Sequence, residues 1–246
     1  MVSGTPETAG PVFTPVQTGA GLPEAVAKRI SEAITTGLIA DGDQLPSEDR
    51  LAAQLGVSTQ TLRASLMVLR QQGLVETRRG RGGGSFAKAP QTRPYADVTE
   101  RLTRLSTADL RDLADEEFAI AGATAMLAAR RYSPANLARL ESLVAELRDT
   151  RDPVEASRVD SRFHIEVAVS CQSERLTRRQ VTLQSEYIDL LWIPENAMDQ
   201  HECARSHAEI LDAIRSERDL EARRLAEEHA RGDLRRIIAL QLRMTA

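Results

Sequence analysis

Residues 55–66 read LGVSTQTLRASL, and this stretch decides the fold of the first part of the chain. Gly56 can adopt the left-handed conformation that ends a helix, and Ser58 is a typical N-cap for the helix that follows. Leu62 and Leu66 recur at helical spacing and predict an inward face, so the polar side chains of the first turn point outward. Two helices joined by such a turn form a helix-turn-helix, whose second helix enters the major groove of DNA.

The segments around this stretch complete the same module. A first helix is expected to begin near Pro23, and a second one after the N-cap Ser47. Residues 74–78 and 85–87 are expected to form two strands joined by a loop rich in glycine and arginine. Alone, such a loop is equally typical of a mobile hairpin tip. After a helix-turn-helix it favours a wing that approaches the minor groove or the phosphates of DNA.

The composition limits the classes of protein to which the chain can belong. Hydrophobic residues make up 41% of its 246 residues and aromatic ones only 3%, which favours helices over a β-sandwich. The two cysteines, Cys171 and Cys203, make no disulfide framework, which suits a reducing compartment. No apolar run approaches the ~20 residues of a membrane span, and the N-terminus has no signal-peptide pattern. We therefore expect a cytoplasmic protein without a membrane partner.

The charge is unevenly distributed along the chain. The whole sequence has a net charge of -4, but residues 58–88 contain six basic residues and a single acid, Glu76. A basic module on an acidic body fits a DNA-reading domain carried by a larger domain that needs no anionic partner.

The sequence as a whole predicts a mainly α protein. Residues 1–20 show no hydrophobic period and are expected to be a disordered arm. We expect a winged helix-turn-helix over residues 21–88, a linker over 89–97, and an antiparallel all-α helical bundle over 98–246. The expected helices of the bundle are 98–104, 107–131, 134–149, 153–171, 174–192, 195–215 and 218–244.

Three helices of the bundle carry a candidate metal site. Asp160 and His164 are four residues apart and share an inward helix face, while His207 and His229 lie on or beside the apolar faces of two other helices. One carboxylate and three imidazoles are ligands that suit a first-row divalent cation. A carboxylate inside a helical core also needs a partner or a metal. The alternative is that the three histidines are hydrogen-bonded core residues.

A rival grouping uses a cysteine. Cys203 and His207 are also four residues apart, with Asp199 nearby. We favour this grouping less, because Asp199 and Cys203 stand among polar neighbours in the sequence. His201 lies on a different helix face and is expected to be solvated.

Short motifs in both halves point to one family. Residues 26–88 carry Leu45-Pro46-Ser47-Glu48, Leu51-Ala52, Gly56-Val57-Ser58, Leu62-Arg63, Leu69 and Gly73-Leu74-Val75. With these motifs, that segment resembles the winged helix-turn-helix of GntR-type bacterial transcription regulators. Residues 106–232 resemble the FCD effector domain of the FadR-like subfamily, through the segments Asp160-x-x-Phe163-His164, His207-x-x-Ile210-Leu211-x-Ala213-Ile214 and Asp219…Glu228-His229.

The resemblance implies a function and a ligand set. Such proteins are homodimers that bind a short palindrome in double-stranded DNA, and they release it or bind it differently when a small metabolite enters the bundle. In many of them an Asp and three His hold a divalent metal beside that metabolite. Carried over, the ligands are Asp160, His164, His207 and His229, and the metal is zinc, with nickel and manganese as alternatives.

The chain also departs from the family pattern. Members often have a DNA-contacting Arg where this chain has Asp49, and another where it has Thr59. In the first long helix of the bundle, a family Arg and a Glu four residues later become Glu117 and Ala121. The first two changes predict a different operator, and the missing bundle Arg argues against a simple carboxylate effector held in the usual way.

We therefore expect a ligand-responsive transcriptional repressor and no enzyme. A metal-dependent hydrolase is the main alternative, but four ligands fill a tetrahedral site and we find no general base beside it. A direct metal sensor is a third interpretation. The expected DNA-binding residues are Ser58, Thr59, Gln60, Thr61, Arg63, Arg79 and Arg81, and the candidate effector-pocket residues are Glu117, Arg162, Tyr187 and Trp192.

Overall fold

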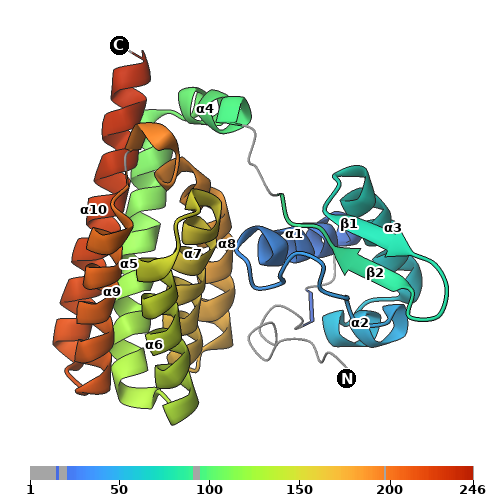
Figure 1. Cartoon of the computed structure of the whole chain (residues 1–246), viewed down its shortest axis with the longest axis horizontal. Coiled ribbons are helices and arrows are strands. Elements are labelled where there is room, and N and C mark those ends of the chain that lie inside the picture. The colour runs from blue at the N-terminus through green and yellow to red at the C-terminus, as the bar shows by residue number, and fades with distance from the viewer. Residues whose placement is uncertain (1–14, 17–20, 91–94, 197, 246) are drawn as a thin grey trace. The chain divides into compact units, whose positions relative to one another are not determined.

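The computed structural model describes residues 15–16, 21–90, 95–196 and 198–245 (Figure 1). The chain divides into two compact units, Met1–Gln91 and Thr92–Ala246. Most of the expected disordered arm lies outside the described residues. Val16 is an exception, because its amide donates a hydrogen bond to the Leu55 carbonyl at 2.9 Å.

The first unit is a helix-turn-helix followed by a two-stranded ribbon. Its elements are α1 (Leu22–Thr35), α2 (Glu48–Leu55), α3 (Thr59–Gln71), β1 (Val75–Arg78) and β2 (Gly84–Ala87). The strands pair antiparallel, from Val75 opposite Ala87 to Arg78 opposite Gly84. Helix α3 packs against α1 and α2. The core of this unit includes the buried residues Val26, Ile30, Ile34, Leu51, Leu55, Leu62, Leu66 and Leu69.

The turn between α2 and α3 has the geometry expected from the sequence. Gly56 has φ 66°, a left-handed value that glycine tolerates and that lets α2 end there. The Ser58 hydroxyl accepts a hydrogen bond from the Thr61 amide at 3.0 Å, so it caps α3. Ser47 occupies the N-cap position of α2, but its side chain makes no capping hydrogen bond.

The second unit is the expected helical bundle. Its helices are α4 (Tyr95–Arg104), α5 (Thr107–Arg131), α6 (Pro134–Asp149), α7 (Pro153–Ser170), α8 (Glu174–Leu191), α9 (Gln200–Arg215) and α10 (Asp219–Thr245). The long helices α5 and α10 lie side by side (Figure 1). Helix α7 packs against α5, α6 and α8, while α9 packs against α5, α6 and α10. None of the described helices is long and apolar enough to cross a membrane.

Two boundaries differ from the sequence-based expectation by more than one residue. The expected linker over 89–97 contains the start of α4 at Tyr95, and the Ala89 amide is tied to the first unit by a hydrogen bond to Asp41 Oδ1 at 2.8 Å. Helix α9 begins at Gln200 instead of residue 195. Asp199 fixes this start, because its carboxylate accepts hydrogen bonds from the backbone amides of His201 and Glu202.

Helix α7 is the central element of the bundle and determines where polar chemistry can occur. Most of its residues are buried, because neighbouring helices cover several of its faces. Phe163 and Val167 join an apolar core with residues of α5, α9 and α10. Asp160 and His164 lie on the same helix and are buried as well, so they must find their polar partners inside the bundle.

Candidate metal centre and nucleic-acid interface

Three helices bring six potential ligands together. Asp160 and His164 come from α7, Cys203 and His207 from α9, and His229 and Asp233 from α10. Each pair is spaced four residues apart, so both of its side chains lie on one helix face. The faces meet inside the bundle, and the side chains of all six residues are buried there.

Asp160 is surrounded by three potential ligands and one donor. Its Oδ1 lies 3.2 Å from His207 Nε2, 3.4 Å from His164 Nε2 and 3.7 Å from Cys203 Sγ. Its other oxygen, Oδ2, accepts a hydrogen bond of 2.7 Å from Trp192 Nε1. Trp192 therefore fixes the carboxylate so that Oδ1 faces the imidazoles.

His229 connects the two sides of the cluster. Its Nε2 lies 3.2 Å from His207 Nε2 and 3.2 Å from Asp233 Oδ2, while its Nδ1 lies 3.0 Å from the Ser206 hydroxyl. Phe163 stacks on the His207 ring, with 3.9 Å between the ring centroids and 9° between the planes. Two imidazole nitrogens that face each other at this distance are suited to sharing a proton or a cation.

The ligands that we expected from the resemblance fall into two overlapping groups. Ligand atoms of Asp160, Cys203, His207 and His229 all lie within 4.8 Å of one another. His164 forms a second such group with His229 and Asp233. Within the described part of the chain, His164 Nε2 is also a buried nitrogen without a hydrogen-bond partner. A buried lone pair of this kind fits a cation-binding cluster.

The electrostatics of the cluster suit a cation. Burial opposes ionisation of Asp160, but the close approach of the His164 and His207 imidazoles outweighs it and holds the Asp160 pKa well below its usual value. Burial lowers the pKa of His207 and, further, that of His229, where the charges of the neighbouring histidines add to the effect. An ionised carboxylate beside neutral imidazoles is the protonation state in which these groups bind a metal.

The other two polar groups respond differently. Burial works against a charge on His164, but Asp160 reverses this and raises the His164 pKa. Burial and then the charge of Asp160 raise the pKa of Asp233 well above its usual value. Asp233 therefore holds its proton to a higher pH than Asp160, and Asp160 carries the negative charge of the site.

A second buried polar group lies on the neighbouring helices α5 and α8. Glu117 accepts hydrogen bonds from Gln180 Nε2 at 2.9 Å and from the Tyr187 hydroxyl at 3.2 Å. Gln184 Nε2 donates to the same hydroxyl at 2.7 Å. Burial raises the pKa of Glu117. Gln180 also lines a small cavity beside His164, with room for about one water molecule.

The four candidate pocket residues have different environments. Glu117 and Tyr187 contact each other, and Trp192 contacts Asp160. Arg162 does not join them, because it is held in ion pairs with Glu146 and Glu155 at 3.0 and 2.8 Å.

Sequence reasoning ranked one member of these groups too low and missed three others. Cys203 is only 5% exposed, although its polar neighbours in the sequence indicated an exposed position. Asp199, its expected companion, instead caps α9. Asp233 carried a usable signal, because it follows His229 by four residues, as His164 follows Asp160. Gln180 and Gln184 are also four residues apart, and Tyr187 follows Gln184 by three, so the three side chains share one helix face. His201 is exposed, as expected.

The candidate DNA-binding residues lie on α3 and the ribbon. Thr59 is half-buried and Gln60 is exposed, whereas the hydroxyls of Ser58 and Thr61 form a hydrogen bond with each other at 2.8 Å. Arg63 forms an exposed ion pair with Glu48 of α2, with 2.7 Å between Nε and Oε2.

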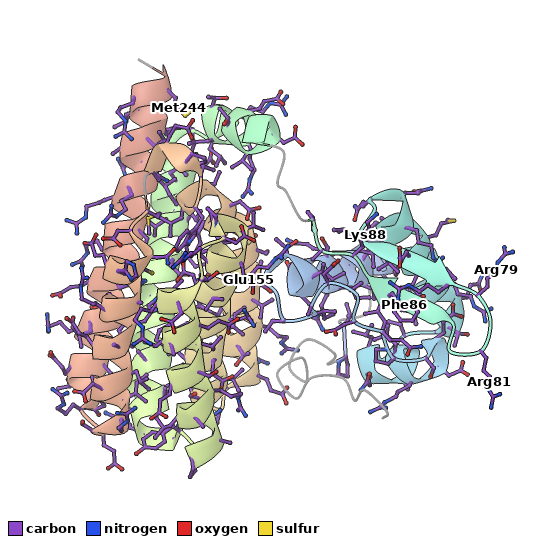
Figure 2. The ribbon with its side chains drawn as sticks, in the orientation of Figure 1. Arg79, Arg81, Phe86, Lys88, Glu155 and Met244 are labelled. Atoms are coloured by element: carbon purple, nitrogen blue, oxygen red, sulfur yellow. The ribbon has the colours of Figure 1, made fainter. Side chains whose placement is uncertain are left out.

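The loop between the two strands carries the exposed arginines Arg79 and Arg81. Figure 2 shows both side chains pointing away from the ribbon. Arg78, one residue earlier, is held differently: it pairs with Glu76 at 2.7 Å and lies over the Phe86 ring, 4.2 Å from its centroid.

The chain is similar to known regulators over most of its length. Residues 22–83 match the model of the bacterial regulatory proteins, gntR family, and residues 99–232 match that of the FCD domain. HTH-type transcriptional regulator RmpR of Mycobacterium gastri is 39% identical over 223 residues, which cover 89% of this chain and 81% of RmpR. The Glc operon transcriptional activator of Escherichia coli strain K12 is 28% identical over 225 residues, or 85% of each protein.

A solved structure supports the fold alone. The structure described as E. coli McbR/YncC is similar to this chain with a TM-score of 0.52 and 16% sequence identity. The match covers 92% of this chain and 100% of that one.

Proposed function

This chain belongs to the gntR family of bacterial regulatory proteins and carries an FCD domain, and we propose that it represses transcription by binding a palindromic operator as a homodimer under the control of a small molecule. The observation that carries the proposal is α3, with its exposed polar first turn, followed by a ribbon whose loop presents two arginines. Two such modules related by a two-fold axis read two half-sites.

Within each module the residues have different roles in DNA binding. Thr59 and Gln60 meet base edges in the major groove. Arg79 and Arg81 contact the minor groove or the phosphates beside it. Ser58 and Thr61 hold the first turn of α3 in place through their mutual hydrogen bond, which leaves them less free to contact DNA.

Arg63 provides the test of this proposal. In the free protein its guanidinium is paired with Glu48, and DNA phosphate replaces that partner on binding. Arg63→Ala is therefore expected to weaken operator binding about tenfold, as measured by gel shift, while Glu48→Gln frees Arg63 and strengthens it. Unchanged affinity in both variants would count against the assignment.

The proposed homodimer has a test of its own. Sedimentation of the protein with and without DNA that contains a palindromic site measures whether two chains associate.

We also propose a divalent metal at Asp160, His164, His207 and His229. The ionised carboxylate, the neutral imidazoles of His207 and His229, and the buried His164 Nε2 that faces Asp160 support it. Zinc is the metal we expect, with nickel and manganese as alternatives. When bound, such an ion supplies a Lewis acid to which an effector group can coordinate. Metal analysis of purified protein and of His207→Ala tests the site, and equal metal content in the two would refute it.

The proposed effector binds next to this cluster. His164 and Gln180 line the small cavity that we take as this site, and Glu117 lies behind it, where it accepts a hydrogen bond from Gln180. Burial raises the pKa of the Glu117 carboxyl, which disfavours an additional negative charge nearby, so a polar uncharged group suits this site better than a carboxylate. Calorimetric titration with a panel of neutral and anionic metabolites tests this preference.

A direct metal sensor is the second candidate, and the buried metal-ligand cluster is the observation that favours it. In that case, removal of the metal by a chelator switches operator binding without any organic effector. If the metal-loaded protein responds only after an organic ligand is added, the effector-controlled repressor is the correct model.

A further inference from the structure

Cys203 lies among the proposed metal ligands but has no assigned role. It sits one turn before His207 on α9, and its Sγ lies 3.8 Å from His207 Nε2 and 3.7 Å from Asp160 Oδ1. The other side of the residue packs against apolar neighbours such as Ala156 and Val159. The Cys203 thiol donates to Asp160 Oδ1, so the sulfur is already directed at two of the proposed ligand atoms.

Four of the six ligand–ligand distances in this group are close to those of a tetrahedral site. With the usual zinc–nitrogen, zinc–oxygen and zinc–sulfur bond lengths, the edges of a tetrahedron are about 3.3 Å between nitrogen or oxygen ligands and about 3.5 Å from sulfur to either. The pairs Asp160–His207 and His207–His229 are each 3.2 Å apart. The two sulfur edges exceed the tetrahedral value by only a few tenths of an ångström, and the remaining two pairs lie within 4.8 Å.

We propose that the Cys203 thiolate is a metal ligand and that it forms a tetrahedral site with Asp160, His207 and His229. This inference rests on the proposed metal site and changes its fourth member. His164 then takes a different position, between the cluster and the small cavity that it lines. From there its imidazole is available to an effector or can enter the coordination sphere as a fifth ligand.

A thiolate ligand changes the choice of metal. Soft sulfur favours zinc, cobalt and copper(I), whereas manganese and magnesium prefer oxygen ligands. Cys203→Ser is therefore expected to lower zinc affinity by about tenfold or more and to leave manganese affinity nearly unchanged. A competition titration with a chromophoric chelator measures both affinities.

Cobalt(II) substitution in the full-length protein tests the bond directly. A cobalt–thiolate bond gives a charge-transfer absorption in the near ultraviolet. We expect this band in the wild-type protein and in Cys171→Ser, the matched control at the only other cysteine, which is also buried. The band is expected to disappear in Cys203→Ser. A band that persists in Cys203→Ser overturns the proposal.

The wild-type protein alone gives a second measurement, which is needed if Cys203→Ser does not fold. X-ray absorption at the zinc edge is expected to show one sulfur at about 2.3 Å from the metal. One bound metal per chain without a sulfur neighbour overturns the Cys203 assignment and leaves the proposed metal site intact. Failure of the wild-type protein to retain any metal overturns both.

Discussion

Glu117 is a buried carboxyl whose raised pKa makes stability depend on pH. Burial is the main cause of the raised pKa, although the hydrogen bonds from Gln180 and Tyr187 oppose it. Below the unfolded-state pKa, about 4.3, the group is protonated in both states and its ionisation destabilises neither. As pH rises above that value, the unfolded chain releases the proton more readily than the folded one, and stability falls.

Glu117→Gln removes this pH dependence while keeping the size of the side chain. At pH 4 we expect the variant and the wild type to differ little in melting temperature for this reason. As pH rises from 4 toward the raised pKa of Glu117 in the folded protein, the melting temperature of the variant is expected to rise relative to that of the wild type. The neighbouring Glu116→Gln is the control with the opposite sign. Glu116 forms an exposed ion pair with Arg179, which lowers its pKa, so its small contribution is present at neutral pH and lost as pH falls. Parallel pH profiles for the two variants would contradict this account.

Trp192 is expected to act on the proposed metal centre through Asp160, whose Oδ2 it contacts. Trp192→Phe keeps the ring but leaves Asp160 Oδ2 without its indole donor. We expect the metal-free protein to lose about 1–3 kcal/mol of unfolding free energy. We expect metal affinity to fall by about 10–100-fold, because the carboxylate is no longer oriented. Trp192 is the single tryptophan, so circular dichroism in urea is the measurement for stability. Full retention of metal affinity would show that the indole does not orient the ligand.

At the scale of elements, the wing is expected to act mainly through charge. Arg79 and Arg81 are exposed at the turn between β1 and β2. Arg79→Ala and Arg81→Ala are each expected to reduce the slope of log affinity against log salt by about 1, and to weaken binding to all DNA sequences alike. Gel shifts at several salt concentrations measure both effects. Arg175→Ala, an exposed charge on α8, is the control. A salt slope unchanged by the wing substitutions would place this loop away from DNA.

The elements themselves were predictable because their boundary signals are local. Ser106 and Ser133 form capping boxes at the starts of α5 and α6, and Pro134 and Pro153 occupy first-turn positions. Gly56 and Ser58 mark the turn before α3 in the same way. Each signal involves residues within about four positions of one another, so the printed sequence contains all the information needed.

The composition of the site was only partly predictable for the opposite reason. Helical spacing placed Asp160 with His164, but the rotation of α9 against α7 decides that Cys203 also faces this carboxylate. That rotation depends on packing between helices about forty residues apart in the chain. Likewise, nothing local revealed that Arg162 is drawn to Glu146 on α6 and away from the cluster.

At the scale of the whole molecule, control of DNA binding from the bundle must be reciprocal. If an occupied metal or effector site changes operator affinity by some factor, operator DNA changes the affinity of that site by the same factor. The coupling expected for such regulators is about 1–3 kcal/mol, or about 5–150-fold. Saturating operator is therefore expected to change the zinc affinity of the protein by a certain factor. We expect bound zinc to change its operator affinity by the same factor. His207→Ala is expected to bind operator with an affinity that added zinc does not alter. If the two factors differ in the wild type, the metal also binds elsewhere. If both factors equal one, metal and operator do not influence each other, and the centre is a structural element of the bundle without a regulatory role.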